Sequence, residues 1–134
     1  MRLRTVKGIL RFKNVSKRVI KWEGESKSKF QKRVKFLVRP LWMNNVVYEE
    51  FPVYGTLYTI DFFNATKKIA VEVQGRQHTQ FVKYFHGTAF NYLEQLKIDE
   101  VKRKFCELNG IKLVEIFEEE SKELSFEFLK NLGL

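Results

Sequence analysis

Two acidic residues interrupt apolar runs in the middle of the sequence, and they are the side chains best placed to do chemistry. Asp61 lies within residues 57–63 and Glu72 lies within residues 69–74, two segments that are otherwise rich in β-branched and aromatic side chains. That composition is typical of β-strands. Because a charge inside an apolar strand is costly to bury, the placement of these two acids indicates a site.

The spacing of the two acids predicts that they face each other. If residues 65–68 form a turn, Asn64 pairs with Ile69, and the same register places Asp61 opposite Glu72. Like charges directly across a sheet repel, and a bound cation is the simplest relief. Carboxylate oxygens are hard ligands that suit Mg²⁺ or Mn²⁺. The alternative is that both acids form surface ion pairs with neighbouring basic residues: Lys67, Lys68 or Arg76.

Composition limits the class of protein. A chain of 134 residues with 44% hydrophobic residues and 13 Phe predicts one globular domain. A single cysteine, Cys106, and two histidines exclude an internal disulfide and argue against structural zinc. No apolar run approaches the roughly 20 residues of a membrane span, and the N-terminus lacks a signal-peptide core. We therefore expect an intracellular, cytoplasmic protein.

Positive charge is concentrated at the start of the chain. Residues 1–45 contain 14 Lys and Arg against two acids, whereas residues 115–134 contain two basic and six acidic residues. A basic first third is the electrostatic pattern of a protein that binds a polyanion such as nucleic acid. The other interpretation is a solvated basic surface without a partner.

The periodicity of the sequence predicts an α/β protein. We expect a basic N-terminal arm over residues 1–25, a core over 26–118 and a C-terminal helix within 119–134. The arm holds two short strands, or a strand and an irregular segment, and residues 77–87 form an aromatic loop. The expected helices are 27–38, ended by Pro40, then 90–109 and 124–132, and the expected strands are 46–51, 57–63, 69–74 and 111–117.

This order of elements, together with the segments Val71–His78 and Asp99–Ile116, resembles the PD-(D/E)xK nuclease superfamily. The resemblance covers about residues 26–118 and is nearest to small single-domain members, the phage-type and mismatch-nicking endonucleases. It implies a restriction-endonuclease-like mixed sheet flanked by helices, in the order helix, three strands, helix, strand. It also implies Mg²⁺- or Mn²⁺-dependent hydrolysis of phosphodiester bonds in DNA.

The resemblance assigns roles to particular residues. Asp61, Glu72 and the backbone carbonyl of Val73 would bind the metal ion. The lysine that the family carries two residues after the second acid is Gln74 here, which shares a strand face with Glu72. Lys102 is our candidate replacement, because it borders the apolar stripe of the 90–109 helix and can extend its ammonium group to the sheet. The alternative for Lys102 is an ordinary surface lysine.

Other residues are candidates for supporting roles. His78, after the Glu72 strand, is a candidate to bind the phosphate or a water, or is an ordinary loop residue; Gln31 is a candidate to orient a water. Gln95 lies beside Lys102 on the helix, and one of Glu49 and Glu50 is a candidate support. Phosphate contacts are expected from basic residues around the first helix and after the third strand of the core: Lys27, Lys29, Lys32, Arg33, Lys35, Arg39 and Arg76.

These expectations describe a DNA endonuclease that selects DNA structure or makes nicks. Cutting both strands would need two sites, which is compatible with a homodimer. Two alternatives remain at this stage. One is a nucleic-acid-binding subunit that has lost catalysis, as the Gln74 replacement suggests. The other is an RNA-processing domain that uses its basic surface with aromatic side chains: Phe81, Tyr84 and Phe85.

Overall fold

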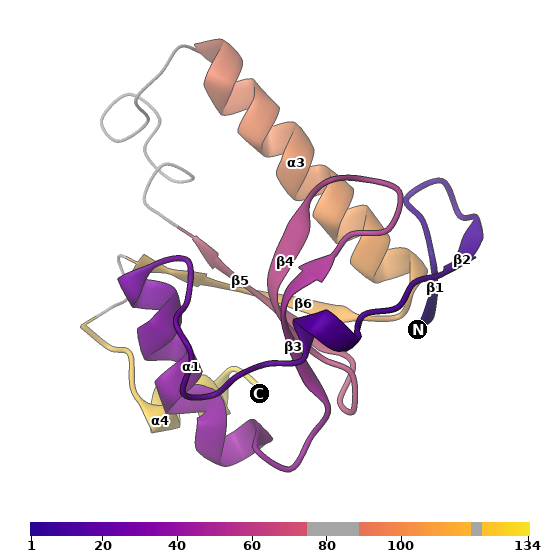
Figure 1. Ribbon diagram of the computed structural model, residues 1–134. Helices are drawn as coiled ribbons and strands as arrows, with labels where there is room; N and C mark the ends of the chain where they lie inside the picture. Colours follow the sequence, from indigo (N-terminus) through magenta and orange to yellow (C-terminus); the bar gives the residue numbers. More distant parts are fainter. Residues whose placement is uncertain (75–88, 119–121) are drawn as a thin grey trace.

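A four-stranded mixed sheet forms the centre of the protein in a computed structural model that describes residues 1–74, 89–118 and 122–134 (Figure 1). The first three strands make an antiparallel meander, and the fourth joins the third in parallel. The sheet order is β3 (Val47–Pro52), β4 (Thr59–Asn64), β5 (Ile69–Gln74) and β6 (Lys112–Phe117). The expected α/β class is confirmed.

Helices cover both faces of the sheet (Figure 1). Helices α1 (Lys29–Trp42) and α4 (Phe126–Asn131) pack on one face, where Phe62 and Trp42 belong to a shared apolar cluster that we call the α1-side core. Helix α3 (Ala89–Leu108) precedes β6 and packs on the other face, where Phe105 belongs to the α3-side core. None of the described helices combines the length and apolar character needed to span a membrane.

Helix α1 begins at Ser28, whose hydroxyl accepts a hydrogen bond from the backbone N–H of Gln31 at 3.1 Å. Our prediction that Pro40 ends this helix is wrong, because the helix continues to Trp42 with Pro40 inside its last turn. Proline removes the bond to the carbonyl of Phe36. Phe36 is exposed, so water can replace that bond and the helix loses little by continuing.

The N-terminal segment packs against the body of the protein. It contains a hairpin of β1 (Arg2–Arg4) and β2 (Leu10–Phe12), which confirms the two-strand alternative, and a 3₁₀ turn η1 (Ser16–Arg18). The Tyr54 hydroxyl donates to the Met1 carbonyl at 2.6 Å. Beyond η1, Val19 pairs with Tyr48 at the edge of β3. The basic residues of this segment are therefore held beside the sheet.

The bounds of the remaining elements agree with those expected from the sequence to within one or two residues. The burial of one side chain differs. In α3 the expected apolar stripe is buried at Phe105 and partly buried at Val101, but Leu108 is exposed. The aromatic loop expected over residues 77–87 lies outside the described residues.

Candidate functional site

Asp61 and Glu72 meet where the β4–β5 ladder ends. The pairs Asn64↔Ile69 to Phe62↔Val71 confirm the expected register, which puts the two acids next in line. There the side chains replace backbone partners: the Asp61 N–H donates to Glu72 Oε1 at 3.2 Å, and the Val73 N–H donates to Asp61 Oδ2 at 2.7 Å. The Asp61 and Glu72 side chains are only 4% and 6% exposed.

Strand β3 changes direction beside these acids. Glu50 has a φ of 55°, a left-handed conformation that costs a residue with a side chain roughly 1–3 kcal/mol. The β3–β4 pairing runs through Glu49↔Phe62 and resumes at Phe51↔Ile60, without a Glu50 pair. Consequently Glu49 contacts α1 whereas Phe51, two residues on, belongs to the α3-side core. The kink brings the Glu50 carboxylate next to the two acids.

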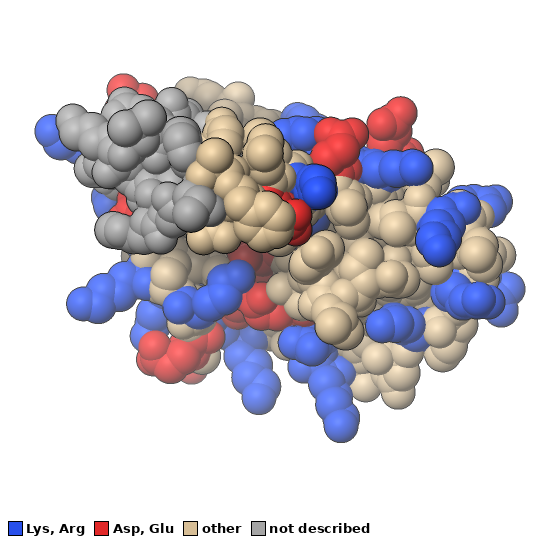
Figure 2. All heavy atoms as spheres, turned by 90° about the horizontal axis from the view of Figure 1, so that it is seen from above, with Lys and Arg blue, Asp and Glu red and all other residues tan. Residues whose placement is uncertain are grey.

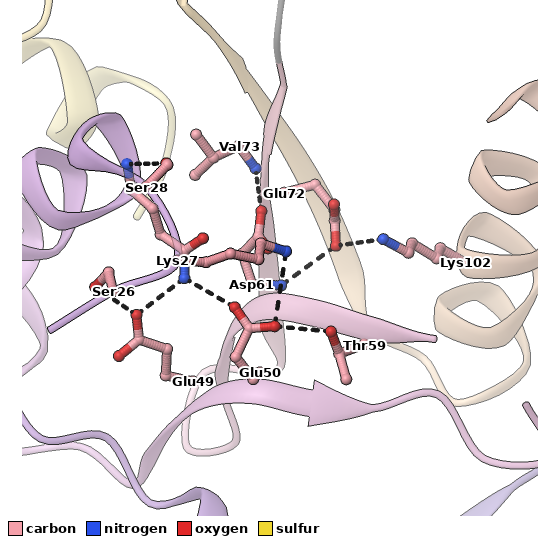
Figure 3. Close-up of polar contacts among 11 residues, drawn as sticks. Ser26, Lys27, Ser28, Glu49, Glu50, Thr59, Asp61, Glu72, Val73 and Lys102 are labelled. Atoms are coloured by element: carbon pink, nitrogen blue, oxygen red, sulfur yellow. Dashed lines mark hydrogen bonds and ion pairs between the residues drawn. The ribbon is translucent and has the colours of Figure 1, made fainter. Parts of the chain in front are cut away.

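Two lysines neutralise the acids from opposite sides (Figure 3). Lys27 Nζ lies 3.1 Å from Asp61 Oδ1 and 3.7 Å from Glu50 Oε2, and its side chain is 62% exposed. Lys102 Nζ lies 3.1 Å from Glu72 Oε1, and its side chain is 12% exposed. The structure thus places Lys102 at the sheet, as its position on the helix border predicted, although its chemical role stays a prediction.

Both acids have raised pKa values in spite of their lysine partners. The pKa of Glu72 is raised to about 7, because burial, the largest cause, and the charge of Asp61 together outweigh the opposing effect of Lys102. Burial also raises the pKa of Asp61, against the Val73 N–H and Lys27. Burial lowers the pKa of Lys27, but the charge and hydrogen bond of Asp61 outweigh this, so that its pKa is raised. An additional cation would stabilise the ionised form of both acids.

The donor atoms fit a hard divalent cation, with a small number of protein ligands. No group of three or more His, Cys, Asp or Glu is arranged to hold a metal within residues 1–74, 89–118 and 122–134. A cation here would therefore be held by Asp61 and Glu72, with the Val73 carbonyl as a predicted third ligand. Mg²⁺ is commonly bound in this way, by one or two carboxylates and several waters.

Gln31 supports β3. It is buried, and its Nε2 donates to Glu49 Oε2 at 2.9 Å and to Glu50 Oε1 at 3.1 Å. Thr59 donates to Glu50 Oε2 at 2.8 Å. The supporting position predicted for Gln31 thus lies beside the acids, where the contacts in the structure are with two carboxylates.

Lys35 corrects one of our predictions. We expected a phosphate contact on the surface, but the side chain is 1% exposed and its Nζ lies 2.9 Å from Glu49 Oε1. The same Nζ donates to backbone carbonyls of Lys21, Gly24 and Glu25. It therefore has no freedom to contact DNA. The missed signal is helical spacing, since the buried stripe of α1 comprises Gln31, Val34, Lys35, Val38 and Trp42.

The other candidates from the sequence are dispersed. Gln74 is buried and lines a hollow together with residues 27–31. Gln95 donates to the buried Asp99 at 3.1 Å. Arg76 and His78 lie outside the described residues. The acids do form ion pairs, as the alternative predicted, but their partners are Lys27 and Lys102. Lys67 instead donates to the Leu134 carbonyl at 2.8 Å.

The basic residues of α1 differ in what they contact. Lys29 and Arg33 are exposed, Lys32 Nζ lies 2.7 Å from Glu25, and Arg39 lies 3.7 Å from Glu23. Figure 2 shows acidic atoms recessed on one face of the molecule with Lys and Arg side chains around them.

Proteins similar to this chain come from two invertebrate iridescent viruses and from Frog virus 3. No family model matches the chain, and no solved structure matches it. "Uncharacterized protein 033L" of Invertebrate iridescent virus 3 is 36% identical over 78 residues, which cover 58% of this chain and 37% of that protein. "Uncharacterized protein 094L" of Frog virus 3 is 38% identical over 66 residues, covering 48% and 43%. The match thus spans less than half the length of each of these relatives.

Proposed function

We propose that this protein is a divalent-cation-dependent nuclease that hydrolyses phosphodiester bonds in DNA, with a restriction-endonuclease-like arrangement of its core. The observation that carries the proposal is the buried Asp61–Glu72 pair with Lys102 Nζ 3.1 Å from Glu72. The order of helix, three antiparallel strands, helix and parallel strand is the one that the resemblance implies.

In this proposal Asp61, Glu72 and the Val73 carbonyl hold Mg²⁺ or Mn²⁺, which supplies polarisation of the phosphate and a lower pKa for the attacking water. The Val73 N–H and Lys27 fix the two oxygens of the Asp61 carboxylate. Lys102 lowers the pKa of Glu72 against the effect of burial and adds positive charge near the phosphate, the contribution of the lysine absent at position 74. The Gln74 amide can orient a water but cannot accept its proton.

The substrate preference follows from the type of contact available. Exposed Lys and Arg side chains neutralise phosphates and do not read bases, so we propose selection by DNA structure, at nicks or branches. A homodimer would supply a second site for cutting both strands. We place this activity in a reducing, cytoplasmic compartment, with Cys106 as a buried free thiol.

A nucleic-acid-binding subunit without catalysis is the second candidate, and one observation favours it. Both acids already have lysine partners, Lys27 for Asp61 and Lys102 for Glu72. Two such ion pairs are compatible with a site that binds nucleic acid without needing a metal ion.

Plasmid nicking tests the proposal directly. Supercoiled plasmid is incubated with the protein and Mg²⁺ or Mn²⁺, with and without chelator, and compared with Asp61→Asn and Glu72→Gln. We expect chelator-sensitive cleavage that both variants abolish, because each removes one of the charged ligands. Glu107→Gln, an exposed acid on α3, is the control and should cleave normally.

Two results would contradict this assignment. Cleavage at the wild-type rate by folded Asp61→Asn or Glu72→Gln would remove these acids from the mechanism. A wild-type protein that is inert with every metal ion, while Gln74→Lys cuts, would favour the binding subunit, because that change restores the lysine of the family.

A further inference from the structure

Two hollows meet at Lys27, beside the Asp61–Glu72 site. The first has a volume of about 320 Å³ and lies between η1 and β3, with Lys17, Arg18 and Lys21 on its wall. The second has a volume of about 330 Å³ and lies between the first turn of α1 and the end of β5, with Phe30 and Gln74 on its wall. Lys27 lines both hollows, and its Nζ bonds Asp61. A strand that occupied both would pass over Lys27, beneath which Asp61 is buried.

The first hollow carries excess positive charge. Lys17, Arg18 and Lys21 are exposed, and across residues 1–74, 89–118 and 122–134 no ion pair involves them. The three acids on the same wall already have lysine partners: Lys35 for Glu49, Lys32 for Glu25 and Lys27 for Glu50. Lys17 and Arg18 of η1, and Lys21 shortly after it, are thus free for an outside partner.

The second hollow offers a different contact. Phe30, partly buried against the α1-side core, lines it together with the first turn of α1, and Lys29 and Glu118 are also on its wall. An aromatic face beside basic residues is the combination on which single-stranded nucleic acid binds, with phosphates on the cations and bases on the ring. Each hollow is of the size of a nucleotide and not of a double helix.

We propose that the two hollows form one track for a single nucleic-acid strand. Phosphates on one side of the reactive bond contact Lys17, Arg18 and Lys21, and the strand continues past Lys27 to Phe30. This deepens the proposed function and rests on it for the position of the reactive phosphate. Phosphate contacts are thereby assigned to Lys17, Arg18 and Lys21 in addition to the exposed Lys29 and Arg33 of α1. Lys35 is buried, and Lys32 and Arg39 are paired with acids.

The test measures strand binding without cleavage. Fluorescence anisotropy of a labelled oligothymidylate and of a duplex is recorded in chelator over a range of salt concentrations. Lys17→Ala, Arg18→Ala and Lys21→Ala together form the test variant, which we call the η1 variant. Lys104→Ala, Lys122→Ala and Lys130→Ala together form the control, because these residues are exposed and lie on α3, before α4 and on α4, and the change in net charge is the same.

We expect the strand to bind more tightly than the duplex. The η1 variant should reduce the slope of log affinity against log salt by about 2, from roughly 0.7 per phosphate contact on a single strand, while the control keeps the wild-type slope. An equal reduction in both variants, or tighter binding of the duplex, would overturn the track. Thermal denaturation checks that both variants fold, and Lys21→Glu alone should weaken binding further than Lys21→Ala.

The binding measurement can support or contradict the track independently of whether the protein is a nuclease. If the wild type never cleaves but the η1 variant loses salt-dependent binding, the track stands and the nuclease proposal fails. If the wild type cleaves while the η1 variant binds like the wild type, the track is wrong and the nuclease proposal stands.

Discussion

Lys35 and Lys27, one on α1 and one just before it, each contact a carboxylate, but the two contacts serve different purposes. Lys35 is buried on the inner side of α1, where its ammonium group donates to Glu49 and to three backbone carbonyls and has no donor left for another partner. Lys27 is largely exposed, and it shares its charge between Asp61 and Glu50. In the first contact every donor has found its acceptor, whereas the second leaves Asp61 with a raised pKa.

The difference separates framework from site. A complete buried network holds α1 and the loop before it against β3, and it leaves no capacity for a ligand. Asp61 and Glu72 have raised pKa values and lie beside the exposed side chain of Lys27, so they can accept another cation. Charge alone therefore does not tell whether a lysine–carboxylate contact is structural or belongs to a binding site. The number of hydrogen-bond partners that each group has makes this distinction.

Breaking the complete network should have the largest effect. Lys35→Met removes one partner of a buried ion pair and leaves Glu49 without its countercharge. We expect a loss of about 3–5 kcal/mol in the free energy of unfolding, measured by urea denaturation. Lys27→Met is the matched control, and its exposed side chain should cost about 1 kcal/mol or less. Equal losses in both variants would show that the two contacts do not differ as we describe.

Removing Lys102 sharpens the comparison at the site. Lys102→Ala should lower the cleavage rate by about 10²–10³, the scale for one electrostatic donor near a developing charge. Because Lys102 lowers the pKa of Glu72, the activity of the variant should recover partly at higher pH. Lys102→Arg should rescue only part of the rate, because the guanidinium is planar and bulkier.

Gln74→Lys in the Lys102→Ala background is the further control, and we expect it to restore activity. If Lys102→Ala cleaves at the wild-type rate and with the wild-type pH profile, Lys102 has only a structural contact with Glu72. Gln74 or a residue outside the described part of the chain would then orient the water.

The pH dependence of stability should show the smallest effect of the three. The pKa of Glu72 is raised from 4.5 to about 7, so the folded protein holds a proton there that the unfolded chain has released. The free energy of unfolding should therefore fall as pH rises between these values, by up to roughly 3 kcal/mol. In chelator, Glu72→Gln should remove the part of this fall that Glu72 causes and leave the part due to Asp61, whose pKa is also raised. The variant should be more stable than the wild type at pH 8 but not at pH 4. Parallel curves for the two proteins would contradict the raised pKa.

The sequence predicted those parts of the site that local geometry determines. The four-residue turn after Asn64 fixes the register of β4 and β5, so the meeting of Asp61 and Glu72 followed from spacing. The helical period of α3 likewise placed Lys102 at the edge of the apolar stripe. These relations involve residues within one hairpin or one helix.

The rest depends on packing between distant segments. Lys35 is buried because α1 docks against β3 and against the loop at residues 21–25, and nothing in its own helix specifies that loop. The left-handed Glu50 has no sequence signal, because a glycine would be the residue expected at such a φ. Lys27 was expected to bind phosphate, and its contact with Asp61 needs the same docking of α1.

The separation of the site residues along the chain also bears on how the protein folds. Asp61 and Glu72 are 11 residues apart, within one hairpin, whereas Lys102 comes 30 residues after Glu72 and Lys27 comes 34 residues before Asp61. Closing a short loop costs less entropy than closing a long one, so the repelling acids can meet before either lysine arrives. A protonated Glu72 would ease that step, and folding should therefore be faster at pH 5 than at pH 8.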